Sequence, residues 1–208
     1  QSQMCIRDRL YDLWYTWVRH HQDYTNHPQD LRSQLRMNIF ILDRDPVSAA
    51  QQMCDKHIPK MVVESLQMMG SALRRHGATD EQMPLSEAGK PIKGGYKNHP
   101  CTRWAGDSRP NYLWLAEHGL ELCSEYTLRY NKIHKCQHKI EHMIEMCGMI
   151  PAGSLTTFAQ AMPDEYRNVD AVVAYRTYYN NDKAYFAKWQ KGRLAPDWWS
   201  PVEEEVTV

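Results

Sequence analysis

The stretch Asp55-Lys56-His57-Ile58-Pro59-Lys60-Met61-Val62-Val63-Glu64-Ser65-Leu66-Gln67-Met68 combines a helical repeat with an unusual density of ionisable side chains. Its less polar residues recur at steps of three and four, which is the spacing of one face of an α-helix. The repeat consists of Ile58, Met61, Val62, Ser65, Leu66 and Met69. The stretch therefore predicts a long amphipathic helix, around which the rest of the chain is expected to be organised.

The ionisable residues of this helix lie close together. Lys56, Lys60 and Glu64 follow one another at four-residue steps and share a face, and His57 precedes Lys60 by three residues. A carboxylate beside two amines and an imidazole is typical of a solvated salt-bridge ladder, and it also suits an active site. Spacing alone leaves both interpretations open.

The residues before this helix predict a short strand and a first helix. Residues 37–42, Met-Asn-Ile-Phe-Ile-Leu, read as a natural start followed by an apolar strand. Asp45 is a suitable N-cap for a helix that opens with Pro46, where a missing N–H costs nothing. Pro59 is expected to break or kink that helix near Asp55, because proline removes a backbone hydrogen bond.

The two ends of the chain are set apart from this domain. Met4-Cys5-Ile6-Arg7-Asp8-Arg9 resembles the conceptual translation of a transposon end that is used to build sequencing libraries. We therefore interpret residues 1–36 as a read-through extension, the alternative being a genuine amphipathic helix at residues 10–19. Residues 37–201 are predicted to form a single helical domain, and residues 202–208 an acidic tail.

The composition is that of a soluble globular protein. The chain has 208 residues, 42% of them hydrophobic and 24% charged, with neither an apolar run of membrane-spanning length nor an evident signal peptide. Its six scattered cysteines are expected to be reduced thiols of a cytoplasmic protein. Residues 37–201 hold 20 Lys and Arg against 18 Asp and Glu, which excludes a polybasic nucleic-acid binder and leaves only a local basic patch.

The residues after the opening helix predict a long loop. The helix is expected to run to about Arg75 and to stop at Gly77. Residues 77–100 are rich in glycine and proline, and loops of this length are usually functional or mobile. Residues 93–104 combine cations with aromatic rings that suit phosphate and base contacts, or they form an ordinary basic loop whose Trp104 fills the core.

The rest of the chain predicts further helices. Ser108 is expected to cap a helix that ends near Tyr130, and others are expected at residues 132–147, 169–179 and 182–190. The expected fold is therefore mainly α: a compact helical domain of about five to six helices with one short N-terminal strand-like segment.

Histidines repeat every four residues on the helix expected at residues 132–147. Two histidines at this spacing can ligate zinc, and the three here are His134, His138 and His142. Because lysines flank the stripe and no metalloprotease motif accompanies it, we interpret it as a solvated helix face and predict no metal site and no cofactor.

Three landmarks carry a resemblance to a known family. They are Met37-Asn38-Ile39-Phe40, Gly95-Tyr96-Lys97-Asn98-His99-Pro100 and Glu125-Tyr126-Thr127-Leu128-Arg129-Tyr130. Over about residues 37–134 the sequence resembles the pyrimidine-dimer DNA glycosylase superfamily, and it is also similar to uncharacterised phage and marine viral proteins. The resemblance implies a small helical enzyme of viral origin that acts as a glycosylase or lyase on damaged or modified bases in DNA.

The resemblance also implies a nucleophile and an acid/base. An N-terminal amine attacks the sugar in such enzymes, and a helix glutamate, here Glu64, moves the proton. Met37 is followed by the bulky Asn38 and is expected to be retained, so the small terminal residue of the family is missing. Lys60 or Lys56 is then the substitute nucleophile.

The remaining candidates are proton-transfer groups and DNA contacts. His57 and His99 are expected to assist proton transfer. The predicted partner is DNA, as a duplex with an extruded base or as a single strand. Two other functions stay open, a non-catalytic viral DNA-binding protein and a helical interaction protein. The predicted DNA contacts are Lys93, Tyr96, Lys97, Asn98, Arg103, Trp104, Arg129, Lys132, Arg176, Tyr179, Lys183 and Lys188.

Overall fold

The computed structural model describes residues 37–201, and the predictions for residues 1–36 and 202–208 lie outside that range. Within it the chain forms six α-helices and two short 3-10 helices, with no strand and one isolated bridge between Leu85 and Pro91. The prediction of a mainly α fold is confirmed. No helix in this range has the length and apolar character needed to cross a bilayer. The elements are α3 (Pro46–Gln51), α4 (His57–Arg75), α5 (Pro100–Asp107), α6 (Arg109–Tyr130), α7 (Gln137–Glu145), η1 (Cys147–Met149), η2 (Asp164–Tyr166) and α8 (Ala171–Asp182).

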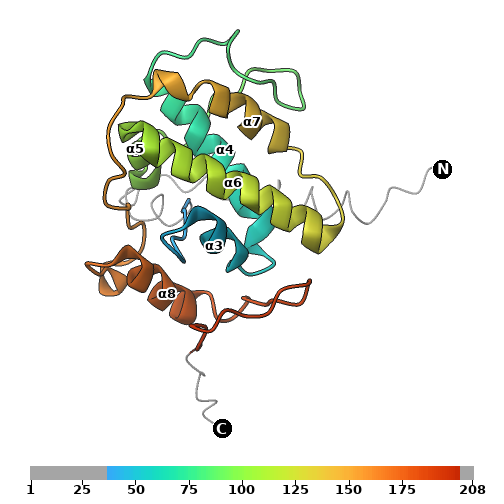
Figure 1. Cartoon of the computed structure of the whole chain (residues 1–208), viewed down its shortest axis with the longest axis vertical. Helices are drawn as coiled ribbons and strands as arrows, with labels where there is room; N and C mark the ends of the chain where they lie inside the picture. The colour runs from blue at the N-terminus through green and yellow to red at the C-terminus, as the bar shows by residue number, and fades with distance from the viewer. Residues whose placement is uncertain (1–36, 202–208) are drawn as a thin grey trace, which may run out of the picture. The chain divides into compact units, whose positions relative to one another are not determined.

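Two long helices, α4 and α6, form the centre of the fold (Figure 1). α6 contacts α3, α4, α5 and α7, and α4 also contacts α5 and α7. α8 lies on the α3 side (Figure 1), and the chain after it returns alongside the C-terminal end of α6, where Lys191 contacts Tyr130. The start of α4 therefore lies close to the last part of the described chain.

α4 begins and ends where the apolar repeat predicts. α3 and α4 are separate helices, so the break expected near Asp55 is present. Pro59 lies in the first turn of α4, where its missing N–H is not needed, and α4 is continuous from His57 to Arg75. The helix stops at Arg75, and Gly77 follows with a φ of 90°. Most of α4 is buried, because neighbouring helices cover it on several sides.

Residues 38–42, expected to form a strand, form a buried turn instead. Phe40 has a φ of 42°, which a β-strand does not allow. The Asn38 side-chain oxygen accepts from the Ile39 and Phe40 N–H groups at 2.8 and 3.3 Å, and the Leu42 N–H donates to the Phe40 carbonyl at 2.8 Å. Side-chain and local hydrogen bonds thus satisfy a backbone that has no neighbouring strand in the described residues.

The helix expected at residues 182–190 is also wrong. α8 continues to Asp182, and the chain beyond it is irregular. Its backbone bonds instead to the start of α4: the Asp55 N–H donates to the Lys188 carbonyl at 2.9 Å, and the Gln190 N–H donates to the Asp55 carboxylate at 2.7 Å. These tertiary partners replace helical hydrogen bonds, which local sequence does not reveal.

α5 was not expected, although its start carries a recognisable signal. The His99 side chain accepts from the Cys101 N–H at 3.2 Å, and Pro100 occupies the first helical position. α7 starts later than expected, because Asn131 ends α6 with a left-handed φ of 52° and residues 132–136 are irregular.

Gly94→Ala is expected to destabilise the protein by about 2–4 kcal/mol. Gly94 has a φ of 79°, and a Cβ built there would overlap Ser71 of α4. Gly89→Ala is the matched control, since Gly89 has a φ of 69° but no atom within 4 Å of the added Cβ. It should lose only about 1 kcal/mol. Urea unfolding measures both, and equal losses would show that the close approach to Ser71 is unimportant.

Candidate active site

Glu64 is buried on α4, and both of its carboxylate oxygens face a nitrogen. The residue is only 6% exposed. Its Oε2 accepts from the Asn38 backbone N–H at 2.9 Å, and its Oε1 lies 3.1 Å from Lys60 Nζ. Burial raises the pKa of Glu64 above its usual value, while the Lys60 ammonium and the Asn38 N–H oppose that shift. A carboxyl group with a raised pKa therefore lies within hydrogen-bond distance of an amine.

The Asn38 nitrogen is held in place from two sides. The Asn38 side-chain amide donates to the Ala161 carbonyl at 2.7 Å, and Thr102 of α5 donates to the Met37 sulfur at 3.6 Å. Burial, and also the nearby Glu64 carboxylate, raises the pKa of the Cys101 thiol to about 12, so the start of α5 lies next to Glu64. The landmark at Met37 and the start of α5 are thus brought together at this carboxylate.

His57 lies in an aromatic cage and does not contact Glu64 by any described hydrogen bond. Its ring stacks on Phe40 at 4.7 Å, packs edge-on against Phe186 at 5.2 Å, and its Nδ1 lies 2.7 Å from the Tyr179 hydroxyl. Burial lowers the pKa of His57 well below 6.5, and Lys60 adds to that shift. A neutral imidazole at this place orders the aromatic cage and the start of α4.

Lys183 is an amine at this site that the sequence placed only among the DNA contacts. Its Nζ lies 3.0 Å from the Tyr178 hydroxyl and 4.4 Å from the centre of that ring. Burial lowers the pKa of Lys183, and the nearby Lys60 adds to that shift. Tyr178 in turn stacks on Phe40 at 6.1 Å. Sequence reasoning missed Phe40 and Tyr178, because their role depends on contacts between distant segments.

The two remaining predicted catalytic residues are Lys56 and His99. Lys56 is exposed, with its Nζ 4.7 Å from the centre of the Phe186 ring. His99 is buried and caps α5. Of the predicted catalytic residues, the structure therefore brings Lys60 into contact with Glu64 and places His57 near Lys60.

The predicted DNA contacts divide by burial. Three of these residues are buried, namely Trp104, Arg129 and Tyr179. Burial removes these three from the set that we propose for DNA. Arg176 and Lys183 are half-buried. The exposed ones are Lys93, Tyr96, Lys97, Asn98, Arg103, Lys132 and Lys188.

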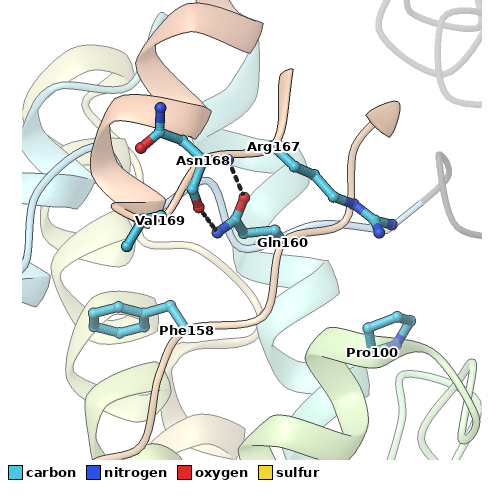
Figure 2. Close-up of a pocket in the computed structure, with 6 residues that line it drawn as sticks. All are labelled: Pro100, Phe158, Gln160, Arg167, Asn168 and Val169. Carbon is cyan, nitrogen blue, oxygen red and sulfur yellow. Dashed lines mark hydrogen bonds between the residues drawn. The ribbon is translucent and has the colours of Figure 1, made fainter. Parts of the chain in front are cut away.

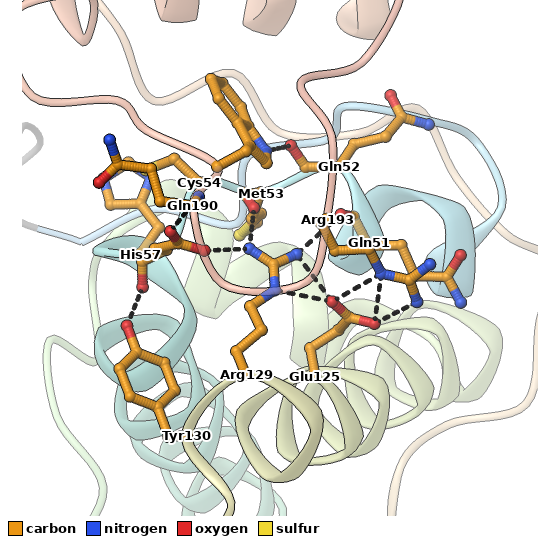
Figure 3. A network of polar contacts seen from close by, with 12 residues as sticks. Gln51, Gln52, Met53, Cys54, His57, Glu125, Arg129, Tyr130, Gln190 and Arg193 are labelled. Carbon is orange, nitrogen blue, oxygen red and sulfur yellow. Dashed lines mark hydrogen bonds and ion pairs between the residues drawn. The ribbon is translucent and has the colours of Figure 1, made fainter.

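Arg129 belongs to a buried ion network (Figure 3). Its guanidinium lies 3.0 Å from the Asp55 carboxylate and 2.7 Å from the Glu125 carboxylate, and it also donates to the Gln51 and Met53 carbonyls at 2.9 and 2.8 Å. Its side chain has no exposed surface. The network joins the segment between α3 and α4 to α6.

An open hollow of about 650 Å³ lies near the Asn38 side of the site. Gln160, which precedes the Asn38 acceptor Ala161, exchanges two hydrogen bonds with the Asn168 backbone, at 2.6 and 3.0 Å (Figure 2). These bonds fix one wall of the hollow. Its lining residues are Pro100, Phe158, Gln160, Arg167, Asn168 and Val169.

The histidine stripe has separate partners. His134 packs edge-on against Tyr126 at 4.8 Å, and His142 lies 2.8 Å from the Gln82 carbonyl. Between residues 37 and 201 no group of three or more His, Cys, Asp or Glu is arranged to hold a metal ion.

The segment that contains Asn38, Lys60, Glu64 and His99 matches a known family. Residues 37–138 match the family model described as pyrimidine dimer DNA glycosylase. The matched segment includes α3 to α6 and the start of α7, and α8 and the chain after it lie outside it. No curated protein and no solved structure matches the chain. The similarity to viral proteins stays a prediction, as do the roles of the individual site residues.

Stability is expected to fall in acid because two buried histidines resist protonation. Burial lowers the pKa of His57 well below 6.5 and that of His118 to about 3. The unfolded chain binds these protons near pH 6.5, so their contribution is fully present above that pH and is lost as the pH falls. Each histidine contributes a slope of about 1.4 kcal/mol per pH unit.

Urea unfolding between pH 7.5 and 5 tests this expectation. His118→Phe keeps a ring on Trp114, with which His118 stacks at 5.2 Å, and should remove one histidine's share of the slope. His138→Phe, at an exposed position, should leave the slope unchanged. Glu64, whose pKa is raised, acts in the opposite direction near its own pKa, and the comparison of variants cancels its effect. Identical slopes in all three proteins would contradict the expectation.

Proposed function

We propose that this protein is a DNA glycosylase with an associated lyase step that acts on damaged pyrimidines. The observation that carries the proposal is the buried Glu64 carboxylate with a nitrogen at hydrogen-bond distance from each oxygen. The match of residues 37–138 to the pyrimidine dimer DNA glycosylase family supports the choice of substrate.

The proposed reaction needs an amine and a proton carrier. Glu64 takes a proton from the amine, and the amine attacks C1′ of the damaged nucleotide. A carbon–nitrogen bond to the protein forms, the glycosidic bond breaks, and Glu64 returns the proton to the departing base. The sugar ring then opens to an imine, which allows removal of a C2′ proton and loss of the 3′ phosphate. The raised pKa of Glu64 suits both directions of proton transfer.

Two nitrogens meet the geometric requirement. Lys60 Nζ lies 3.1 Å from Glu64, and its side chain is 43% exposed, so DNA can reach it. The Asn38 nitrogen lies 2.9 Å from Glu64 and becomes an amine only in a chain that starts at Asn38. We propose Lys60 as the nucleophile of the full chain, and a chain that is made to start at Asn38 would offer the Asn38 amine in its place. Lys56 is less suitable, because its amine lies against Phe186.

Borohydride trapping tests the proposal. The full chain and a chain that starts at Asn38 are each incubated with duplex DNA that carries one cyclobutane pyrimidine dimer, and the imine is reduced. We expect a covalent adduct, which peptide mapping assigns to Lys60 in the full chain. Lys60→Ala should abolish the adduct of the full chain but not an adduct on the Asn38 amine. Absence of an adduct in both chains, with dimers and with oxidised pyrimidines, would refute the proposal.

A further inference from the structure

Residues 183–193, which we term the basic strap, have an unusual composition. The sequence Lys-Ala-Tyr-Phe-Ala-Lys-Trp-Gln-Lys-Gly-Arg has four cations and three aromatic residues and no acidic residue. It lies outside the segment that matches the glycosylase family. Lys183 lies at the candidate active site, and the catalytic chemistry proposed above does not use the other three cations of the strap.

The strap is attached to the domain through its backbone, through Arg193 and through the side chains of Lys183, Phe186 and Trp189. The Asp55 N–H donates to the Lys188 carbonyl, and the Gln190 N–H donates to the Asp55 carboxylate. Arg193 Nε donates to the Glu125 carboxylate at 3.1 Å. Figure 3 draws this contact beside Arg129. These contacts leave the side chains of Lys188 and Lys191 exposed. The acidic residues beneath the strap are thus already paired with arginines.

Lysines from two other elements extend the charge of the strap. Lys56, at the start of α4, lies over the strap residue Phe186 at 4.7 Å. Lys191 of the strap lies over Tyr130 of α6 at 5.1 Å, and the exposed Lys132 follows two residues later. Three separate segments therefore place lysines around the start of α4.

These lysines differ from most other cations of the described chain in having no acidic partner. The four lysines are Lys56, Lys132, Lys188 and Lys191. None of them forms an ion pair with a carboxylate of residues 37–201. By contrast, Lys93 pairs with Asp80, and Lys135 and Lys139 pair with Glu87. Uncompensated positive charge on one surface attracts a polyanion and is sensitive to salt.

The distance between this surface and Glu64 corresponds to a few base pairs of DNA. Lys56 precedes Glu64 by eight residues, which is a rise of about 12 Å along α4, or between three and four base pairs of duplex DNA. Tyr185 of the strap is 82% exposed and offers a ring for contact with a sugar or a base. DNA held at Glu64 would thus extend over the strap.

We propose that the basic strap, with Lys56 and Lys132, binds the phosphate backbone of the undamaged DNA that flanks the lesion. The proposal rests on the proposed function for the choice of DNA as the polyanion. It assigns to the strap an affinity that depends on salt and not on the presence of damage.

Salt-dependent binding of the full chain to an undamaged 25-base-pair duplex tests the proposal. Lys188→Gln/Lys191→Gln is compared with Lys90→Gln/Lys135→Gln, which removes the same charge from the region near Glu87. We expect the strap variant to lower the slope of log K against log salt by about 2, because each phosphate contact contributes about 0.9. Affinity at 50 mM salt should fall about tenfold or more. Both substituted side chains are exposed, and a thermal melt checks that the variants fold.

The outcomes separate the strap from the chemistry. Equal slopes for the strap variant and the control would overturn the proposal even if the borohydride adduct forms. A reduced slope for the strap variant alone supports it even if no adduct forms, in which case only the proposed reaction falls. The proposal would also be overturned if the strap variant lost more affinity for an acidic peptide than for DNA.

Discussion

Glu64→Gln should reduce the rate of adduct formation on dimer-containing DNA by about 100-fold or more, because it removes the group that moves the proton. Glutamine keeps the size of the side chain and can still accept from the Asn38 N–H at the position where Glu64 accepts at 2.9 Å. Binding to undamaged DNA should change less than about threefold, since the basic strap is untouched. Single-turnover trapping and anisotropy measure the two quantities.

The pH dependence and a matched control make this result specific. Burial raises the pKa of Glu64. As the pH decreases, the rate of the parent protein should therefore begin to fall at a pH above the usual pKa of a glutamate. The Glu64→Gln variant should not show this pH dependence. Glu117→Gln, on an exposed part of α6, should leave the rate unchanged. If Glu64 were only structural, its glutamine variant would lose stability and keep its rate.

Arg129→Met should destabilise the fold by about 3–5 kcal/mol, because it leaves Asp55 and Glu125 buried without their shared cation. The Arg129 side chain has no exposed surface, so water does not replace the lost charge. The Gln51 and Met53 carbonyls would also lose their donor. Urea unfolding measures the loss.

Arg193→Met is the control for this prediction. Arg193 also contacts Glu125, but its side chain is 34% exposed, and Glu125 keeps Arg129 when Arg193 is removed. We expect a loss of about 1–2 kcal/mol. Similar losses in the two variants would show that burial of Arg129 is not the decisive factor.

Local sequence predicted the parts of the site that lie within one helix. The three- and four-residue repeat placed α4, and the four-residue step placed Lys60 beside Glu64. It did not place the Asn38 nitrogen, which is 26 residues away and reaches Glu64 only through the turn at Phe40. A landmark that begins at Met37 was the one signal that pointed to this contact.

Composition was a poor guide to which cations are available. Arg129 was expected to contact DNA, but Asp55, 74 residues earlier, draws it into the core. The helix expected at residues 182–190 was wrong for the same reason, since Asp55 also bonds to the backbone of the strap. Whether a charged side chain is buried depends on the residue with which it pairs, and the paired residues here are distant in sequence.

The long sequence separation between Asp55 and the strap also affects how the protein folds during synthesis. The Gln190 N–H and Trp198 Nε1 bond to residues 135 and 146 positions earlier, so α3 and α4 are complete on the ribosome long before these partners exist. Closing such long loops is slow and comes late. A nascent chain that has not reached residue 193 would expose the acidic groups that the strap covers. We therefore expect truncated chains to depend on chaperones until the strap has emerged.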